Sequence, residues 1–283
     1  MAYYPQNATG LNYITYPAGP TVGSATVVTA SGSANVKGSY AQISASIGFT
    51  CNAIYLDCYG GNSQNDEYKL DFATGAGGAE TVVIPDITLT LANGDPTEKG
   101  SRRFPLAIAS GTRVSARVAC TTGSRNLRCA LTIMAAGGVA GISTFIVGGP
   151  TAIDPGGSAN TKGSYAQLFA STSAVLQWLS IGMATAALST IGTSWYADVA
   201  TGAGGAEVVL IPDINAVIGV SNGAIHHCFH EMLTYIAAST RIAVRASSDN
   251  TSAGTRGFDA TLIGGTAPSE SSGGGAFSAA YVG

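Results

Sequence analysis

Hydrophobic and polar positions alternate with a period of two through much of the chain. In the segment VSARV, Val114, Ala116 and Val118 point to one side of an extended backbone, and the residues between them are polar. Ile242 and Val244 repeat this alternation in the second half of the chain. Such a pattern places one face of a strand in a core and the other in water, as in antiparallel sheets. Further strands are predicted at residues 39–47, 52–59, 67–73, 81–88 and 129–134, with counterparts in the second half.

The strand-forming segments occur twice. GSANVKGSYAQ (32–42) returns as GSANTKGSYAQ (157–167), and ATGAGGAETVVIPDI (73–87) returns as ATGAGGAEVVLIPDI (200–214). A third block, IASGTRVSARV, returns more loosely as IAASTRIAVRA. The two copies are about 127 residues apart, which is longer than a solenoid repeat or a propeller blade and is the size of a domain. The sequence therefore predicts a tandem duplication of a whole domain.

Each copy holds about seven or eight short strands separated by Gly, Asn, Asp, Pro and Ser, and a long helical pattern is absent from the sequence. We expect an all-β protein with two tandem antiparallel β-sandwich domains of jelly-roll-like type. The predicted organisation is an N-terminal docking arm (1–18), a first sandwich (19–136), a linker (137–148), a second sandwich (149–265) and a Ser/Gly-rich C-terminal tail (266–283).

The low charge excludes several classes of partner. Only 10% of the residues are charged, the net charge is −3, and the 13 Lys and Arg residues form no basic stripe for nucleic acid. The N-terminal MAYYPQNATG lacks the basic and apolar regions of a signal peptide. Residues 129–149 carry no charge, but glycines divide their apolar clusters, which favours strand, linker and strand over a membrane span. We expect no nucleic-acid partner, no membrane span and synthesis in the cytoplasm.

The repeated motifs offer two candidates for chemistry. ATGAGGAE is rich in glycine, but a phosphate-binding loop ends in Gly-Lys-Ser/Thr before a helix, whereas Glu80 and Glu207 follow here and a strand comes next. We therefore expect a tight turn. The KGSYAQ blocks begin with Lys37 and Lys162, which we expect at solvated strand entrances.

Asp71 and Asp198 occupy matching places in LDFATG and ADVATG. A duplicated Asp could act as a catalytic carboxylate or a calcium ligand, but an Asp on the outer face of a strand is more often solvated or bonded to a neighbouring loop. Glycoside cleavage needs a second carboxylate, and none is identified. A catalytic triad lacks support as well, because all histidines lie in one segment and no G-x-S-x-G elbow precedes a helix. We predict no catalytic residue and no cofactor.

All three histidines lie in HHCFHE at 226–231. On a strand, His226, Cys228 and His230 would share one face, and imidazole and thiolate are good zinc ligands. Consecutive ligands would be about 6.6–7 Å apart, which is far for one tetrahedral ion. The first copy has nothing similar at the aligned place. We expect a polar surface or interface strand, and a metal-dependent enzyme remains the weaker alternative.

The cysteines offer one candidate disulfide. Cys120 and Cys129 flank the loop TTGSRNLR symmetrically, so we expect them to face each other across a hairpin. A buried cross-strand disulfide and two buried thiols are both open. Cys51 and Cys58 cannot bridge each other within one extended strand. Cys228 is left over, which leaves an intermolecular bond open in an oxidising setting.

The N-terminal segment carries no charged side chain before Lys37 and contains Tyr3, Tyr4, Tyr13 and Tyr16. Tyrosine supplies amphipathic contact area at low entropic cost, so we expect these four residues at an interface. The C-terminal SESSGGGAFSAAYVG has the composition of a flexible spacer followed by a small apolar tip. The two ends are either docking arms that order in an assembly or frayed termini.

The three blocks, GSANVKGSYAQISAS, ATGAGGAETVVIPDI and IASGTRVSARV with their second copies, resemble those of a group of tailed-bacteriophage virion proteins. The resemblance covers both predicted sandwiches but neither the arm nor the tail, and HHCFHE departs from the pattern. It implies a β-sandwich on the outside of a phage particle, as a head decoration, spike or fibre base, collar or tail accessory protein.

The expected function is therefore that of a non-enzymatic virion component. It would form a homo-oligomer through sheet faces and uncharged arms, with copies of itself and other virion proteins as partners. The alternative is a carbohydrate-binding adhesin for a host-surface glycan, with Tyr55, Trp178 and Trp195 as the aromatic platform. The aligned first-copy positions of the tryptophans hold Ala53 and Tyr68, so a platform shared by both copies is not evident.

Overall fold

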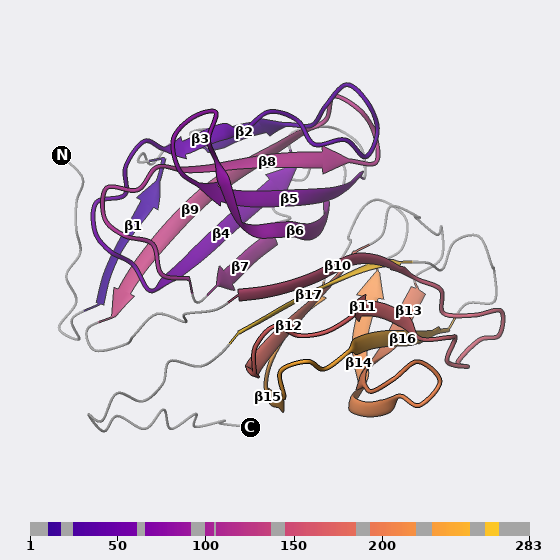
Figure 1. The fold of residues 1–283 in the computed structure, drawn as a ribbon. Coiled ribbons are helices and arrows are strands. Elements are labelled where there is room, and N and C mark those ends of the chain that lie inside the picture. The colour runs from indigo at the N-terminus through magenta and orange to yellow at the C-terminus, as the bar shows by residue number, and fades with distance from the viewer. Residues whose placement is uncertain are drawn as a thin grey trace, which may run out of the picture.

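The fold is known from a computed structural model, in which every regular element is a β-strand in the residues that it describes (Figure 1). None of the described segments is a helix of the length and apolar character needed to cross a bilayer. The described residues are 11–17, 25–60, 66–91, 100–104, 106–136, 145–184, 193–218, 228–249 and 258–265.

Two facing sheets form the first sandwich. The strands of one sheet are β1 (Leu11–Tyr16), β2 (Thr26–Thr29), β9 (Asn126–Ala136), β4 (Ala53–Gly60) and β7 (Gly100–Phe104). The strands of the other are β3 (Ala41–Ser44), β8 (Val114–Cys120), β5 (Asp66–Thr74) and β6 (Thr81–Leu91).

The second sandwich repeats this arrangement. One sheet contains β10 (Phe145–Ile153), β17 (Phe258–Gly265), β12 (Leu176–Ala184) and β15 (Cys228–Ile236). The other contains β11 (Ala166–Phe169), β16 (Ile242–Ser248), β13 (Thr193–Thr201) and β14 (Val208–Ile218).

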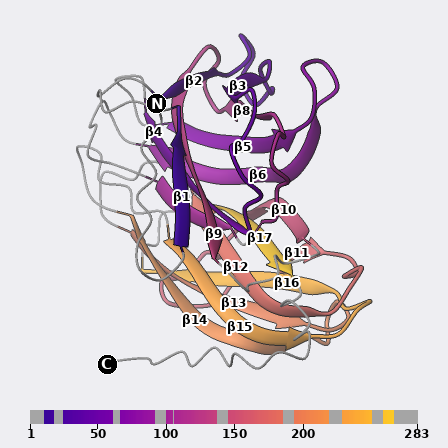
Figure 2. The ribbon, with the colours of Figure 1, turned by 90° about the vertical axis from the view of Figure 1, so that its left-hand side faces the viewer.

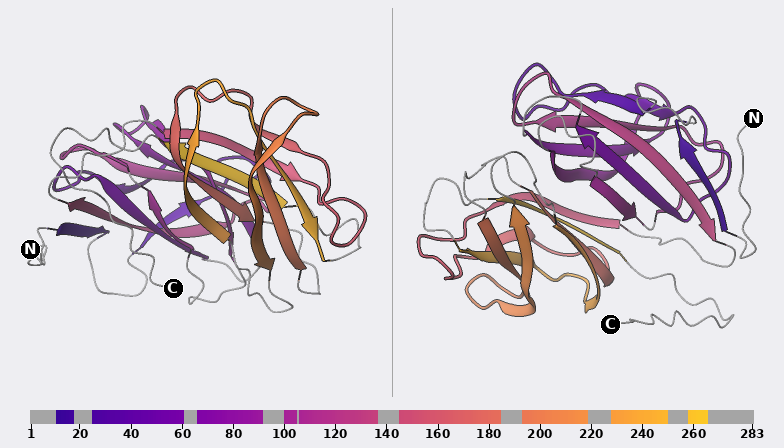
Figure 3. Two further views of the ribbon diagram at one scale, coloured as in Figure 1. Left: turned by 90° about the horizontal axis from the view of Figure 1, so that it is seen from below. Right: turned by 180° about the vertical axis from the view of Figure 1, so that it is seen from behind.

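The strand order identifies each sandwich as a jelly roll. In the first sandwich the sheets run β2-β9-β4-β7 and β3-β8-β5-β6, with antiparallel pairing throughout. The second sandwich has the matching orders β10-β17-β12-β15 and β11-β16-β13-β14. From β2 and from β10 onward, consecutive strands change sheet except at the β5–β6 and β13–β14 hairpins, as in the double Greek key of a jelly roll. The predicted class, two tandem all-β jelly-roll-like sandwiches, is confirmed, and Figures 2 and 3 show the two bodies from three further sides.

The ends of the predicted domains are placed differently from the sequence-based boundaries. Residues 11–16, which were expected within a docking arm, pair with β9 as β1, ahead of β2 on the same strand. Together β1 and β2 correspond to β10, which runs along the whole of β17. The segment 145–148, which was expected in the linker, is the beginning of β10. Both segments therefore contribute strands to the sandwiches.

The core lies between the two sheets of each sandwich, as the alternation predicts. Val114, Ala116 and Val118 are fully buried on β8, and Ile242 and Val244 are fully buried on β16. The intervening positions are not all exposed to solvent. Ser115 is fully buried, and the Arg117 and Arg245 side chains are half-buried against the rings of Tyr40 and Tyr165 in the KGSYAQ blocks.

Candidate functional site

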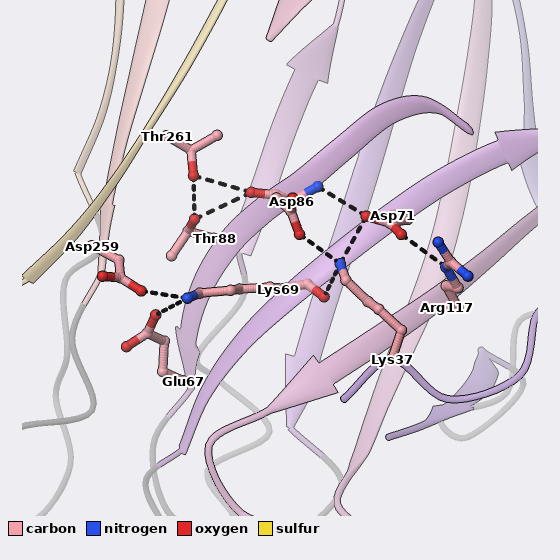
Figure 4. Close-up of polar contacts among 9 residues, drawn as sticks. All are labelled: Lys37, Glu67, Lys69, Asp71, Asp86, Thr88, Arg117, Asp259 and Thr261. Carbon is pink, nitrogen blue, oxygen red and sulfur yellow. Dashed lines mark hydrogen bonds and ion pairs between the residues drawn. The ribbon is translucent and has the colours of Figure 1, made fainter. Parts of the chain in front are cut away.

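A buried carboxylate lies at the centre of the repeated motifs in the first jelly roll. Asp71 accepts hydrogen bonds from Lys37 Nζ at 2.7 Å, Arg117 Nε at 2.8 Å and the backbone N–H of Asp86 at 3.0 Å (Figure 4). Lys37 Nζ also donates to the Lys69 carbonyl at 2.8 Å and pairs with Asp86 Oδ1 at 2.8 Å. The expectation that Lys37 is solvated is wrong, because its ammonium group is enclosed by these acceptors.

The second jelly roll repeats the network atom by atom. Asp198 accepts from Lys162 Nζ at 2.8 Å, Arg245 Nε at 2.9 Å and the Asp213 N–H at 3.0 Å. Lys162 Nζ also donates to the Tyr196 carbonyl at 2.7 Å. The solvated position expected for Lys162 is therefore wrong as well, and the duplicated Asp residues are bonded to neighbouring segments.

Electrostatics keeps both carboxylates ionised. Burial raises the pKa of Asp71, but hydrogen bonds from Lys37, the Asp86 N–H and Arg117 outweigh it and hold the pKa below its ordinary value. The pKa of Asp198 is lowered for the same reasons. The hydrogen bond to Asp71 raises the pKa of Arg117 despite partial desolvation. A general acid or base needs a pKa near the working pH and a free oxygen, and these carboxylates have neither.

The network secures an irregularity in the sheet. The register between β5 and β6 jumps from Leu70–Ile87 to Phe72–Ile84, so Pro85 and Asp86 form a bulge opposite Asp71. Proline has no N–H to donate, and Asp86 has a φ of 48°. Because of the bulge, the Asp86 N–H does not bond to the neighbouring strand's backbone, and it donates a hydrogen bond to the Asp71 carboxylate instead.

The ATGAGGAE loop is closed by a second ion pair. Glu80 accepts from the Gly78 N–H at 2.9 Å and from Arg113 Nη1 at 3.0 Å. Arg113 also donates to the Gly75 carbonyl at 3.1 Å and to Gln42 Oε1 at 2.9 Å. In the second copy the same contacts are made by Glu207, Gly205, Arg241, Gly202 and Gln167. The predicted tight turn is confirmed.

The Gly and Tyr of KGSYAQ also have structural roles. A Cβ added to Gly38 would lie 2.0 Å from the backbone carbonyl oxygen of Thr29. One added to Gly163 would lie 2.4 Å from the backbone carbonyl oxygen of Asp154. The guanidinium of Arg117 lies 4.7 Å from the centre of the Tyr40 ring, and the second copy repeats this stacking with Arg245 and Tyr165. The repeated motif therefore encodes backbone geometry and packing.

A hollow of about 550 Å³ borders KGSYAQ between β2 and β3. Its lining includes Val27, Lys37 and Tyr40. Lys37 is the charged residue of the lining, and its ammonium group is held by Asp71 and Asp86. The hollow therefore does not gather a set of groups for proton transfer.

The two jelly rolls are joined by a buried polar contact on β6. The hydroxyl of Thr88 hydrogen-bonds that of Thr261 on β17, and Thr261 Oγ1 donates to the Asp86 carbonyl at 3.0 Å. Lys69 Nζ lies 2.5 Å from Asp259 Oδ2 at the border of this contact (Figure 4). The bulge that Asp71 stabilises therefore also presents the Asp86 carbonyl, which accepts a hydrogen bond from the second repeat.

Apolar packing extends the same contact. β6 touches β10, β12 and β17 of the second jelly roll. Trp178 on β12 and Ile263 on β17 belong to the hydrophobic cluster of the first jelly roll. The sheet β3-β8-β5-β6 of the first repeat therefore packs through its edge against the sheet β10-β17-β12-β15 of the second.

The aromatic platform expected for a glycan is not formed by the tryptophans. Trp178 is buried at the contact between the repeats, and Trp195 is buried with its ring 5.0 Å from that of Phe258. Of the three expected residues, Tyr55 alone is exposed, on the outer face of β4.

The histidine segment is only partly described. His226 lies outside the described residues, whereas Cys228 and His230 lie on β15 in register with Met183 and Ile181. The side chains of Cys228 and His230 are also outside the described part. No group of three or more His, Cys, Asp or Glu able to hold a metal ion occurs among the residues that the structure describes.

Of the two alternatives for Cys120 and Cys129, the structure shows two buried thiols and no disulfide. Cys120 lies on β8 opposite Tyr68, and Cys129 lies on β9 in the other sheet, opposite Cys58. The loop between them crosses from one sheet to the other, so the hairpin that the symmetric spacing suggested does not exist. The Sγ atoms of Cys58 and Cys129 are 3.7 Å apart, which is beyond a disulfide bond, and the hydrogen bond with Cys58 and burial raise the pKa of Cys129. Cys51 is likewise a buried thiol.

The predicted interface tyrosines are found in different settings. Tyr3 and Tyr4 lie outside the described residues, and Tyr13 is placed on β1 without a described side chain. Tyr16 is half-buried, and its hydroxyl accepts a 2.8 Å hydrogen bond from the Gly48 N–H. Tyr16 therefore anchors β1 to its own sandwich. The predicted tail at 266–283 lies outside the described residues.

No protein-family model and no curated protein matches this chain. Among solved structures, the chain is similar to PNGF-II, with 7% identity, a TM-score of 0.40 and coverage of 91% of this chain and 65% of the other. It thus spans slightly less than two thirds of that protein. The CBM22-1-CBM22-2 tandem domain of Xyn10C from Paenibacillus barcinonensis is similar at 7% identity and a TM-score of 0.26, with 93% of each chain covered.

A structure of the Gx strain of infectious bursal disease virus is similar at 12% identity and a TM-score of 0.23, with 95% of this chain and 75% of the other covered. These similarities concern the all-β fold and carry no information about a site.

Proposed function

We propose that the chain is a non-enzymatic structural component of a tailed-phage particle, located on the virion as a decoration, spike or fibre base, collar or tail accessory. The observation that carries the proposal is the duplicated network around Asp71 and Asp198. Its charged groups are used to hold backbone irregularities in place, and they do so identically in both repeats. A motif that is retained for geometry is what a building block requires.

The arrangement of the two jelly rolls supports the same role. A buried hydroxyl pair, an ion pair and a shared apolar cluster join them. Linked in this way, the two sandwiches act as one unit that can transmit force or span a distance in an assembly. The block order, which resembles that of phage virion proteins, supports a position for this unit on a particle.

The enzyme alternative has little support. The best-placed carboxylates have lowered pKa values and accept hydrogen bonds from cationic groups. The adhesin alternative is weakened because Trp178 and Trp195 are buried. An exposed Tyr55 by itself is a small platform for a sugar ring.

The test is the composition of purified particles. Particles of the phage whose genome encodes this chain are purified on a density gradient. They are analysed by mass spectrometry and labelled with immunogold against this protein. We expect the chain to co-band with the particles and the gold to lie at one defined location, and a deletion of its gene to remove density there. A chain that stays in the soluble fraction, or particles unchanged by the deletion, would refute the proposal. A glycan array probed with the intact protein tests the adhesin alternative in parallel.

A further inference from the structure

The strand β14 of the second jelly roll is the counterpart of β6, but its outer side is more exposed. In the repeated IPDI motif, the Asp86 side chain is 28% exposed on β6 and the Asp213 side chain is 65% exposed on β14. Thr88 is fully buried at the contact between the repeats, whereas Asn215 at the equivalent place is exposed. The second repeat thus presents the edge that the first repeat buries.

The start of β14 adds an exposed apolar run beside this edge, where the first repeat has the exposed Thr81 in place of Val208. Val208 is 68% exposed, and Val209 and Leu210 follow it as exposed residues. Three of the large exposed hydrophobic residues in the described part of the chain are therefore consecutive on one strand. An apolar run on a sheet edge is the usual mark of an interaction site. We call Val208, Leu210, Asp213 and Asn215 the β14 surface.

The complementary surface lies on the first jelly roll. The register of β9 with β4 and of β17 with β12 makes Arg128, Ala130 and Thr132 the counterparts of Asp259, Thr261 and Ile263. Within the chain, Asp259 pairs with Lys69 of β5, Thr261 bonds to Thr88 of β6, and Ile263 belongs to the hydrophobic cluster of the first jelly roll.

Their counterparts on β9 are only half-buried. They lie on the outer face beside the exposed Tyr55 and Val27, which pair with Thr132 and Arg128. We call Val27, Tyr55, Arg128 and Ala130 the β9 surface.

The position of the ion pair within the chain is occupied by a different pair of side chains on the two surfaces. Within the chain, Lys69 on the β6 side meets Asp259 on the β17 side. The alignment that matches Asp71 with Asp198 places Tyr196 at the Lys69 position, and Arg128 stands at the Asp259 position. An aromatic ring would thus face a guanidinium where the ion pair stands within the chain. On the β14 side the exposed Asp213 carboxylate is paired with Lys162 Nζ at 2.9 Å.

We propose that the β14 surface of one copy docks on the β9 surface of a second copy, repeating between chains the contact that β6 makes with β17 within a chain. The contact joins two different surfaces, so a copy that uses its β14 surface still has its β9 surface available for another copy. Such head-to-tail association closes into a ring or continues as a filament. This inference rests on the proposed function for the setting in which copies meet, and it names the surface that they use.

The first test separates the two surfaces. Sedimentation equilibrium of the full chain is compared with that of the variant Val208→Ser/Leu210→Ser, with Val36→Ser as control because Val36 is 48% exposed on a loop outside both surfaces. The double variant should weaken association about tenfold or more, and the control should match the wild type. Ala130→Arg, which places a large charged side chain on the β9 surface, should weaken association to the same extent.

Mixing the two blocked variants gives the sharper result. Each retains one intact surface, so a one-to-one complex should form and grow no further, whereas neither variant should self-associate. Wild-type chain that stays monomeric to millimolar concentration, or blocked variants that associate like the wild type, would overturn the inference.

A crosslinking experiment does not depend on affinity. In a Cys228→Ser background, Asn215→Cys combined with Ala130→Cys places thiols at the positions that correspond to the bonded Thr88 and Thr261. Oxidation should give a ladder of covalent multimers on non-reducing gels, and neither single variant should. Thr88→Cys with Thr261→Cys is the matched control and should give only a crosslinked monomer.

Absence of the ladder refutes the contact. Absence of the chain from particles refutes the proposed function and leaves the ladder unaffected.

Discussion

The hydroxyl groups of Thr88 and Thr261 form a hydrogen bond between residues 173 positions apart, and both side chains are fully buried. The bond joins strands of two separate jelly rolls, and Thr261 also donates to the carbonyl of Asp86 in the IPDI bulge. The bulge is itself held by Asp71. The network inside the first repeat and the contact between the repeats are therefore one continuous structure.

This continuity predicts that the repeats separate when the threonine pair is disturbed. Thr261→Lys would place an ammonium group in a buried contact and should lower the free energy of unfolding by about 2–4 kcal/mol. Calorimetry should show it as two transitions in place of one. Thr81→Lys is the control, because Thr81 is an exposed threonine on the same strand as Thr88. A single transition at the wild-type temperature would contradict the prediction.

Removal of the Asp71 charge should be costly, because Lys37 and Arg117 would lose the buried carboxylate that they share. Asp71→Asn is expected to reduce the free energy of unfolding by about 3–5 kcal/mol, as for other broken buried ion pairs. Urea titration measures the difference. Asp154→Asn, a change at an exposed Asp, should stay within about 0.5 kcal/mol of the wild type. An equal effect of the two substitutions would show that the network contributes no stability.

The same carboxylates predict how stability depends on pH. The pKa values of Asp71 and Asp198 are lowered in the folded state, so near and below about pH 4 the unfolded chain binds more protons than the folded one. Their stabilisation is fully present above the unfolded pKa and is lost as the pH falls through the folded pKa. Urea midpoints between pH 7 and pH 2 should fall, and Asp71→Asn/Asp198→Asn should flatten that slope. An unchanged slope would contradict the assignment.

The strands and their class could be predicted from the sequence because alternation is a local signal. Val114, Ala116 and Val118 show it on β8, and the same positions are buried in the structure. The duplication then gave two copies of one sandwich. The symmetric spacing of Cys120 and Cys129 was misleading, because spacing within a loop does not reveal that the chain changes sheets there.

The ion-pair network was missed because its members are distant in sequence. Lys37 and Asp71 are 34 residues apart, and a strand pattern does not indicate which loop covers which strand. A signal was nevertheless present. In a chain with only 10% charged residues, Lys37, Asp71, Asp86 and Arg117 all recur in the second copy, which favours mutual pairing over exposure to solvent. The contact of Thr88 with Thr261 could not be predicted in this way, because it occurs once and its residues do not recur in the other repeat.

The glycine of KGSYAQ provides a prediction that separates geometry from chemistry. Gly38→Ala would bring a methyl group to 2.0 Å from the Thr29 carbonyl oxygen, so the chain must shift where it passes the end of β2. We expect a loss of about 2–3 kcal/mol in the free energy of unfolding, and Gly163→Ala should cause a similar loss in the second repeat. Gly204→Ala is the matched control, because a Cβ there meets nothing within 4 Å. Chemical denaturation of the three variants decides the matter: if Gly38→Ala is as stable as Gly204→Ala, the repeated glycine is not required by close backbone approach.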